Sequence, residues 1–286
     1  MADAGAASLG PVLTVMSVIA VPKMYALRRD FIPVALLVAG CVNGFAAQIT
    51  EALQSEGIKS APFFGISPFE LITICIAATL MLGPKSEARH SGFGWVEGTA
   101  AAAILVPSGS FSWCVVAVYA VYVALRGGAG QRVGAYLFAG LAFAALWTSI
   151  VAKWFAMAFT TLDASMVHTV LAAVQDNIEQ ANNMVGHSDG FGIVVILTCS
   201  TAYALPNAMV FLAAMAHGRG SVNYVKLSRN IALFSAIFVA ANVGRLALMA
   251  SNEAMYELAH GPVGANLFDA FQIVAMLILS GGVDRE

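Results

Sequence analysis

Nine apolar runs, each close to the length of a membrane-spanning helix, dominate the sequence. A spanning helix needs about 20 mainly apolar residues. The runs cover residues 8–22, 31–50, 67–83, 93–108, 110–126, 133–158, 191–216, 227–250 and 263–281. They predict an all-α fold, a polytopic transmembrane helical bundle of eight or nine spans. The chain would form a single integral membrane domain over 1–286, divided into N-terminal spans (1–158), a connecting segment (159–190) and three further spans (191–281).

The composition agrees with a membrane protein. Hydrophobic residues make up 59% of the chain and charged residues 10%, against roughly 25% charged in soluble domains. The mean hydropathy is +0.81. A net charge of -2 offers no basic surface for nucleic acid. Residues Met1 to Leu9 contain no Lys or Arg, unlike the start of a cleaved signal peptide, so we expect the first run to remain as a span.

The positions of lysine and arginine predict the orientation, because cytoplasmic loops accumulate these residues and translocated loops do not. Of the 14, eleven fall on one side of the predicted layout: Lys23, Arg28, Arg29, Lys85, Arg89, Arg126, Arg132, Arg219, Lys226, Arg229 and Arg285. Lys59 falls in a loop on the other side, and Lys153 and Arg245 lie within spans. The sequence therefore predicts an outer N-terminus and a cytoplasmic C-terminus.

This orientation brings three reactive residues toward the outer face. Cys199 would lie roughly 12 Å below the outer end of the seventh span if that helix starts at Gly190. Arg245 lies near the outer end of the eighth span, and His260 follows in the short outer loop before the ninth. Such a depth is too dry for easy thiolate chemistry. We therefore expect the helix to start later than Gly190, or a polar cleft to reach the thiol.

The three residue types can together support acyl-transfer chemistry. A buried cysteine is inert unless a cation or a base favours its thiolate. Cys199 could attack a peptide carbonyl, with His260 as the base and then as the acid that protonates the leaving amine. Arg245 stays protonated, so it could only hold the thiolate, the oxyanion or a substrate carboxylate. Asn242, one turn earlier, could orient the guanidinium or the substrate backbone.

Structural explanations compete with these roles. Cys199 could be an ordinary apolar residue of its helix, and Arg245 could snorkel or pair with Glu253 or Glu257. The remaining cysteines form no CxxC pair, which gives no sign of a disulfide or a zinc site, and are expected to be apolar helix residues: Cys41, Cys75 and Cys114.

Other polar residues on the outer side have their own alternatives. His168 and His187 compete with His260 as the base. Lys153 is expected to snorkel, although it could meet a lipid phosphate. The acidic residues of the connecting segment are expected to form a solvated face: Asp163, Asp176, Glu179 and Asp189.

Three segments of the C-terminal part resemble the exosortase and archaeosortase family. Ile193-Val-Val-Ile-Leu-Thr-Cys199-Ser200-Thr201 looks like the cysteine-bearing helix of that family. Ala241-Asn242-Val243-Gly244-Arg245-Leu246 looks like its Asn-x-x-Arg helix, and Ala259-His260-Gly261-Pro-Val-Gly264 like its His-plus-glycine element. The order and approximate spacing also match, and the resemblance covers roughly residues 180–281. Many members continue Cys-Ser with Gly, whereas Thr201 stands here, which leaves the subfamily and its substrate motif open.

The resemblance implies a membrane cysteine protease and transpeptidase of the bacterial inner membrane, with its active site toward the periplasm. Its substrates would be exported proteins with a C-terminal sorting tail, which carries a recognition motif, a transmembrane helix and a basic end. Cleavage near the motif would transfer the new C-terminus to an acceptor, for which a membrane lipid or glycan is a candidate. Cys199 would be the nucleophile, Arg245 and His260 its partners, and no metal or other cofactor is implied. The supporting residues would be Ser200, Asn242 and Gly261.

The segment 159–190 and the function class each keep alternatives. Apolar residues recur near helical spacing from Leu162 to Ile178, which predicts a helix at the membrane surface, followed by a stretch rich in Asn and Gly. This segment could cover the site as a lid or be a connector without substrate contact. A small-solute transporter stays open, although no internal repeat is visible. So does a noncatalytic component of an exopolysaccharide or export system, in which Cys199 would be replaceable.

Overall fold

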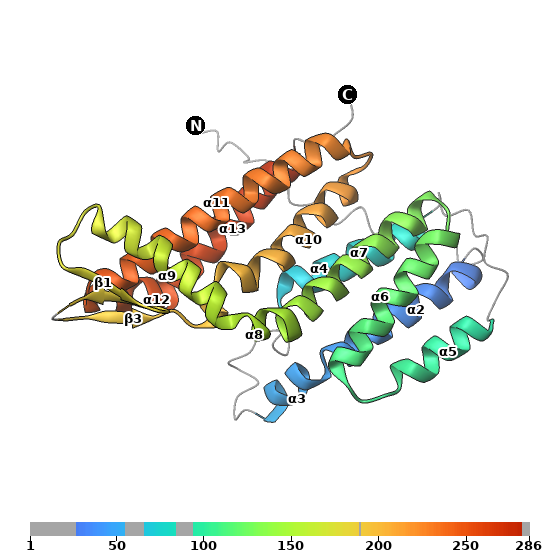
Figure 1. Ribbon diagram of the computed structural model, residues 1–286. Coiled ribbons are helices and arrows are strands. Elements are labelled where there is room, and N and C mark those ends of the chain that lie inside the picture. Colours follow the sequence, from blue (N-terminus) through green and yellow to red (C-terminus); the bar gives the residue numbers. More distant parts are fainter. Residues whose placement is uncertain (1–26, 55–65, 84–93, 189, 282–286) are drawn as a thin grey trace, which may run out of the picture.

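The computed structural model describes residues 27–54, 66–83, 94–188 and 190–281, so the first predicted span, 8–22, lies outside the described residues. Most of the described chain is helical (Figure 1). The N-terminal half contains α2 (Leu27–Gly44), α3 (Ala46–Gln54), α4 (Pro68–Leu82), α5 (Trp95–Ile104), α6 (Gly109–Arg126) and α7 (Ala129–Leu146).

The C-terminal half adds a small sheet to its helices. Its helical elements are the π-helical turn η2 (Trp147–Val151), α8 (Ala152–Trp154), α9 (Ala156–Ala172), the 3-10 turn η3 (Leu197–Cys199), α10 (Thr201–Arg219), α11 (Tyr224–Ser251), α12 (Glu253–His260) and α13 (Pro262–Gly281). Its strands are β1 (Ile178–Ala181), β2 (Met184–His187) and β3 (Gly192–Val194).

Several helices are long and apolar enough to cross a membrane, as expected of a membrane protein. Within the described part of the chain there are four: Gly109–Arg126, Ala129–Trp154, Tyr224–Ser251 and Val263–Gly281, and shorter apolar helices cover Phe31–Gly44 and Pro68–Leu82. These helices confirm a helical membrane bundle but not a count of eight or nine spans. The predicted span 93–108 contains only the ten-residue helix α5, which ends before Pro107.

Small residues bring the helices of the N-terminal half together. α7 packs against α4 and α6, and α2 packs against α6. A Cβ atom on Gly134 of α7 would meet the Ala77 carbonyl of α4, and one on Gly40 of α2 would meet the Val116 side chain of α6. In a membrane, lipid tails are as apolar as the side chains, so close backbone approach at small residues contributes much of the packing energy.

Helix α10 joins the two halves, because it packs against α4 and α7 and also against α11 and α13. Glu70, in the first turn of α4, accepts a hydrogen bond from Asn207 Nδ2 of α10 at 3.2 Å. Trp147 Nε1 donates to the Ala202 carbonyl of α10 at 2.8 Å. These two bonds fix both the middle and the start of α10 against the N-terminal half.

A cap of mixed structure, residues 156–196, lies at one end of the bundle (Figure 1). It consists of α9 and an antiparallel sheet in the order β1-β2-β3. Asn177 precedes β1, and Asn182 lies in the turn between β1 and β2. Their φ values are 58° and 55°, a conformation that Asn adopts more readily than most residues. Val185 and Ile193 point into a buried cluster with side chains of α9 and α11. The expected helical bundle is confirmed, and this small sheet is an addition to it.

The structure shortens the seventh predicted span, 191–216, at its start. Its first residues form β3 and the turn η3, and the α-helix starts only at Thr201. A short apolar run looks the same in the sequence whether it becomes a buried strand or part of a buried helix. The expectation of a start later than Gly190 is confirmed.

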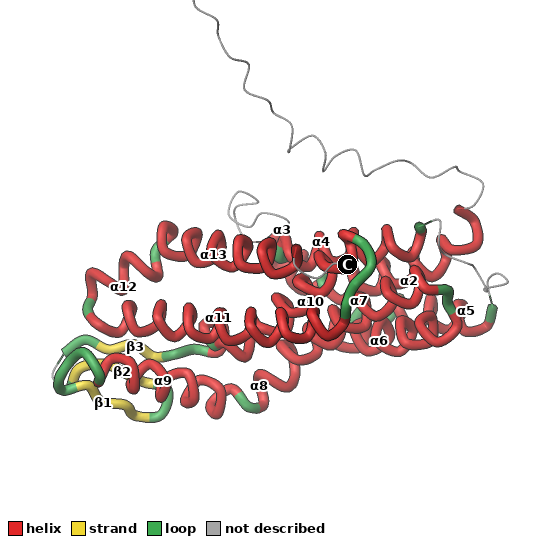
Figure 2. The backbone as a smooth tube through the Cα atoms, turned by 90° about the horizontal axis from the view of Figure 1, so that it is seen from above, coloured by secondary structure: helices red, strands yellow, loops and turns green. Residues whose placement is uncertain are grey.

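Helix α11 extends beyond the other spans. Its 28 residues measure about 42 Å, more than the ≈ 30 Å of a hydrocarbon layer. Figure 2 shows α12 connecting the far end of α11 to α13, beside the sheet. A Cβ atom on Gly264 would meet Ala259 Cα, so glycine is required where α13 approaches α12.

Candidate functional site

The helices α10 and α13 reach the same level on the side of the cap. Arg219, near the last turn of α10, donates from Nη1 to the Leu277 carbonyl of α13 at 3.4 Å, so both helices finish at a common level. Counted back from there, α10 has 19 residues and α13 has 20, or about 28 and 30 Å. Both lengths are close to the ≈ 30 Å of a hydrocarbon layer, and Cys199 and His260 lie just before the first residues of these helices.

Cys199 is the last residue of the 3-10 turn before α10 and is half-buried. The depth of roughly 12 Å assumed a helix from Gly190. A strand and a turn replace that helix, so the premise of this depth does not hold. Its side chain packs at the margin of the apolar cluster that joins α9, the sheet and α11.

Asn242 of α11 holds the backbone around Cys199. Its Nδ2 donates to the Cys199 carbonyl and to Thr201 Oγ1, both at 3.0 Å. The side chain is 4% exposed, so water competes little for these bonds. Asn242 therefore ties the turn before α10 to α11, one helical turn from Arg245.

Asp163 of α9 holds the same turn from another side. Its Oδ2 accepts the Thr201 backbone N–H at 3.0 Å, and the residue is 2% exposed. The expectation of a solvated Asp163 was therefore wrong. The sequence contained a signal, because Asp163 shares a helical face with Val167 and Leu171, and both of those are buried.

The backbone N–H groups around the thiol already have acceptors. They donate as follows: Cys199 to Ile196 O and Ser200 to Leu197 O at 3.0 Å, Thr201 to Asp163, and Ala202 to Ser200 Oγ at 3.3 Å. Ser200 is thus the buried N-cap of α10. An oxyanion at this turn would need donors from side chains.

Arg245 offers such donors. Its Nε donates to the Ala259 carbonyl at 3.2 Å, and its Cζ lies 5.1 Å from the centroid of the Phe268 ring. Among the described residues, neither Nη group has a hydrogen-bond acceptor, and no ion pair joins Arg245 to Glu253 or Glu257. The static pair considered from the sequence is not observed, and the two Nη groups are free to bind a ligand.

His260 is the last residue of α12 and is exposed. Its ring stacks on Tyr256 with centroids 5.0 Å apart and an interplanar angle of 22°. Gly261 ends α12, and its N–H donates to the Glu257 carbonyl at 2.9 Å. His260 therefore sits on a short helix next to Ala259, the residue that accepts from Arg245.

The structure brings these residues to one end of α11 without joining their reactive groups. Cys199 contacts Asn242 directly, and Arg245 follows Asn242 by one turn. Cys199, Ala259 and Tyr256 share one apolar cluster. Within the described ranges, however, no hydrogen bond links the Cys199 thiol to Arg245 or His260.

The competing residues are placed differently. His187 lies with Nε2 3.3 Å from the Ser251 carbonyl, which ties β2 to the end of α11. His168 is half-buried on α9, and Lys153 of α8 is exposed. Cys41 is buried, whereas Cys75 and Cys114 are exposed on helices of the N-terminal half.

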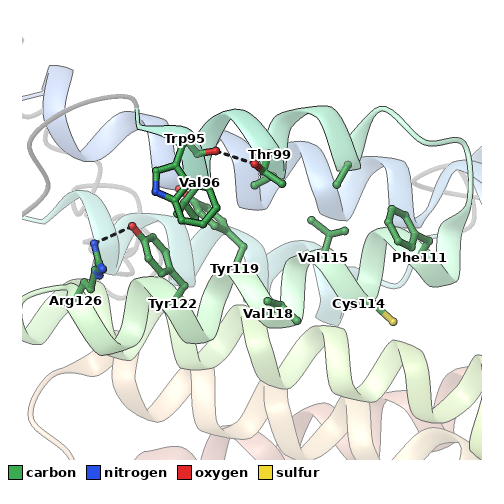
Figure 3. A pocket seen from close by; sticks show the side chains of 12 residues that line it. Trp95, Val96, Thr99, Phe111, Cys114, Val115, Val118, Tyr119, Tyr122 and Arg126 are labelled. Carbon is green, nitrogen blue, oxygen red and sulfur yellow. Dashed lines mark hydrogen bonds between the residues drawn. The ribbon is translucent and has the colours of Figure 1, made fainter.

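A groove of about 570 Å³ lies between α5 and α6, away from the Cys199 turn (Figure 3). Apolar and aromatic side chains line most of it, including Trp95, Val118 and Tyr119. Arg126 at one end donates to Tyr122 Oη at 3.2 Å. Cys114 also lines the groove, but no histidine or carboxylate does, so this thiol has no base beside it.

No protein-family model, curated protein or solved structure matches the chain. Over the part of the chain that the structure describes, no group of three His, Cys, Asp or Glu side chains could hold a metal ion.

Proposed function

We propose that the chain is a membrane cysteine peptidase and transpeptidase of the exosortase type. It would cleave the C-terminal sorting tail of exported proteins at the outer face of the bacterial inner membrane. The observation that carries this proposal is the fixed turn at Cys199. Asp163 and Asn242 hold its backbone, and Arg245, one helical turn from Asn242, has two Nη groups without an acceptor among the described residues. A cysteine that only filled space in a helix would need none of these bonds.

In the proposed reaction, His260 turns away from Tyr256 and takes the proton of the Cys199 thiol. Catalytic hydrogen bonds often form only once substrate is bound, so their absence in the free protein does not exclude this role. The thiolate then adds to the scissile carbonyl, and the new oxyanion is held by the Nη groups of Arg245, since the local backbone donors are occupied.

Collapse of this tetrahedral intermediate breaks the C–N bond. The leaving amine takes its proton from His260, and a thioester remains on Cys199. Water, or an amine or hydroxyl of an acceptor, then attacks the thioester, passes a proton to His260 and releases the thiolate, which is protonated again. A site at the outer boundary of the membrane would suit this chemistry, because the tail's helix could stay in the bilayer while the acceptor approaches from the outer side.

The test follows a candidate tailed protein from the same genome, expressed with the chain in membranes and scored on a gel for loss of its tail. Cys199→Ala is expected to reduce processing to background, because no other group can form the thioester. Cys114→Ala, the matched control from the groove, should leave processing intact. Full processing by Cys199→Ala would reject the peptidase and favour the noncatalytic component.

A further inference from the structure

The strand β3 leads into the Cys199 turn and forms one edge of the sheet. It pairs antiparallel with β2 in the register Met184↔Val194, Val185↔Ile193 and Gly186↔Gly192. Its other edge pairs with no described strand, since the sheet order is β1-β2-β3. α9 packs against β1 and β2, and α11 packs against β2 and β3, with Val185 and Ile193 buried between the sheet and these helices.

The hydrogen bonds show which β3 groups face this edge. The His187 N–H donates to Phe191 O, and the Val195 N–H donates to Asn183 O. In an antiparallel pair, hydrogen-bonded and non-hydrogen-bonded residues alternate, so Ile193 also faces β2. Gly192 and Val194 therefore direct their N–H and C=O groups away from β2, and no described residue bonds to them.

This edge lacks the usual protection against pairing. Natural edge strands carry lysine, proline, a bulge or a covering segment. Residues 190–196 contain no charged residue and no proline. Val194 and Ile196, which flank the edge, are 51% and 53% exposed.

We propose that the edge of β3 binds the segment of the substrate next to the scissile bond as an added strand. This inference rests on the proposed function, and the partner is an extended, uncharged stretch of peptide. Its backbone would bond to Gly192 and Val194, and alternate side chains would pack against Val194 and Ile196. Extended peptides bind other sheet edges in this way, with affinity from the main chain and specificity from alternate side chains.

The direction of the added strand follows from the membrane. β3 leads along its sequence toward the start of α10, since Gly192 lies in the cap and Cys199 adjoins that start. In the proposed site, the start of α10 lies at the membrane boundary. A sorting tail enters the bilayer after its cleavage site, so the residues before that site approach the boundary in the same direction. The substrate strand therefore runs parallel to β3, and its scissile bond follows the paired residues toward the thiol.

The test compares two alkylating probes on the purified full chain in detergent, read by mass spectrometry at Cys199. One probe is acetyl-trialanine chloromethyl ketone, which can pair with the edge, and the other is iodoacetamide, which cannot. Val194→Pro removes the outward N–H but keeps an extended backbone. It should slow the peptide probe about tenfold, the effect of losing one or two ordinary hydrogen bonds, and leave iodoacetamide unchanged. Val194→Thr, the matched variant, keeps the N–H and should slow the peptide probe much less than Val194→Pro does.

A second measurement needs no variant and compares two peptide probes, each N-methylated at one of two adjacent residues. In a strand, neighbouring residues point their N–H groups to opposite edges, so only one of the two methylations should slow labelling of the unaltered protein. Equal rates for the two methylated probes, or an unchanged peptide rate in Val194→Pro, would overturn the proposal. So would a shift from dimer to monomer in Val194→Pro with unchanged labelling, which would assign the edge to a second copy. Each of these results leaves the loss of processing in Cys199→Ala, and hence the peptidase, intact.

Discussion

The two halves of the molecule use buried polar groups differently. In the N-terminal half, buried Glu70, Glu97 and Gln131 each accept a hydrogen bond from the backbone N–H at the start of their own helix, and the groove there holds Cys114 without a base among its described lining residues. In the C-terminal half, buried Asp163 and Asn242 are both directed at one turn of backbone. Burying such groups is costly unless they are hydrogen-bonded. Their convergence on the turn at Cys199 is what supports the proposed site there and not at the groove.

Exchanging the arginines of the two halves for glutamine should give the largest contrast. Arg245→Gln removes the cationic donors for the oxyanion, and loss of one oxyanion donor typically lowers a rate by about 10² to 10³. Arg126→Gln removes a cation that contacts only Tyr122 among the described residues, and processing of the tailed substrate should be unchanged. Arg245→Lys tests the fork geometry, because lysine keeps the charge but not the planar donor pair. Equal rates for the two glutamine variants would remove Arg245 from the mechanism.

Replacing one glycine in each half with alanine should separate the effect of close helix contact on stability from that of helix propensity. Gly134→Ala places a methyl group against the Ala77 carbonyl and is expected to cost about 1 to 3 kcal/mol of stability. Gly244→Ala on α11 meets nothing within 4 Å and should be neutral or stabilising by up to about 1 kcal/mol, because alanine favours the helix. Thermal unfolding in detergent should show a lower Tm only for Gly134→Ala. A rise in Tm for both variants would mean that helix propensity, and not close contact, dominates.

Asp163 should matter through its hydrogen bond to the turn. Asp163→Ala leaves the Thr201 N–H buried without an acceptor, so processing should fall about tenfold. Asp163→Asn keeps an acceptor oxygen and should recover most of the rate. Asp176→Ala, an exposed acidic residue of the same outer segment, is the control and should match the parent. If Asp163→Asn is no better than Asp163→Ala, the carboxylate charge is needed and not merely the acceptor.

The smallest effect is expected in the groove between α5 and α6. Val118 lines it and is 72% exposed, so Val118→Trp fills space without disturbing the core. Processing should stay within about twofold of the parent, as for most surface substitutions. A larger loss would connect the groove to the site and weaken the contrast between the halves.

The spans could be predicted more reliably than the cap. The runs 110–126, 133–158, 227–250 and 263–281 fall on helices because apolar length alone defines a spanning helix. The hairpin has strands of only three or four residues, which carry too few positions for a clear period of two. Cys199, Arg245 and His260 could be chosen from their residue types and order, whereas the distant backbone group that Asp163 meets, the Thr201 N–H, could not.

The sequence by itself therefore determined that the chain is a helical membrane protein, with a cysteine and an arginine in its seventh and eighth predicted spans and a histidine in the loop before the ninth. These are consequences of composition and periodicity, which are local. Only the tertiary structure decided that α10 starts at Thr201, that Asp163 and Asn242 hold the Cys199 turn, and that β3 leads to it with a free edge. Those features depend on contacts across roughly 40 residues of chain, such as Asn242 with Cys199. No pattern within one helix specifies which distant backbone group a buried polar side chain will meet.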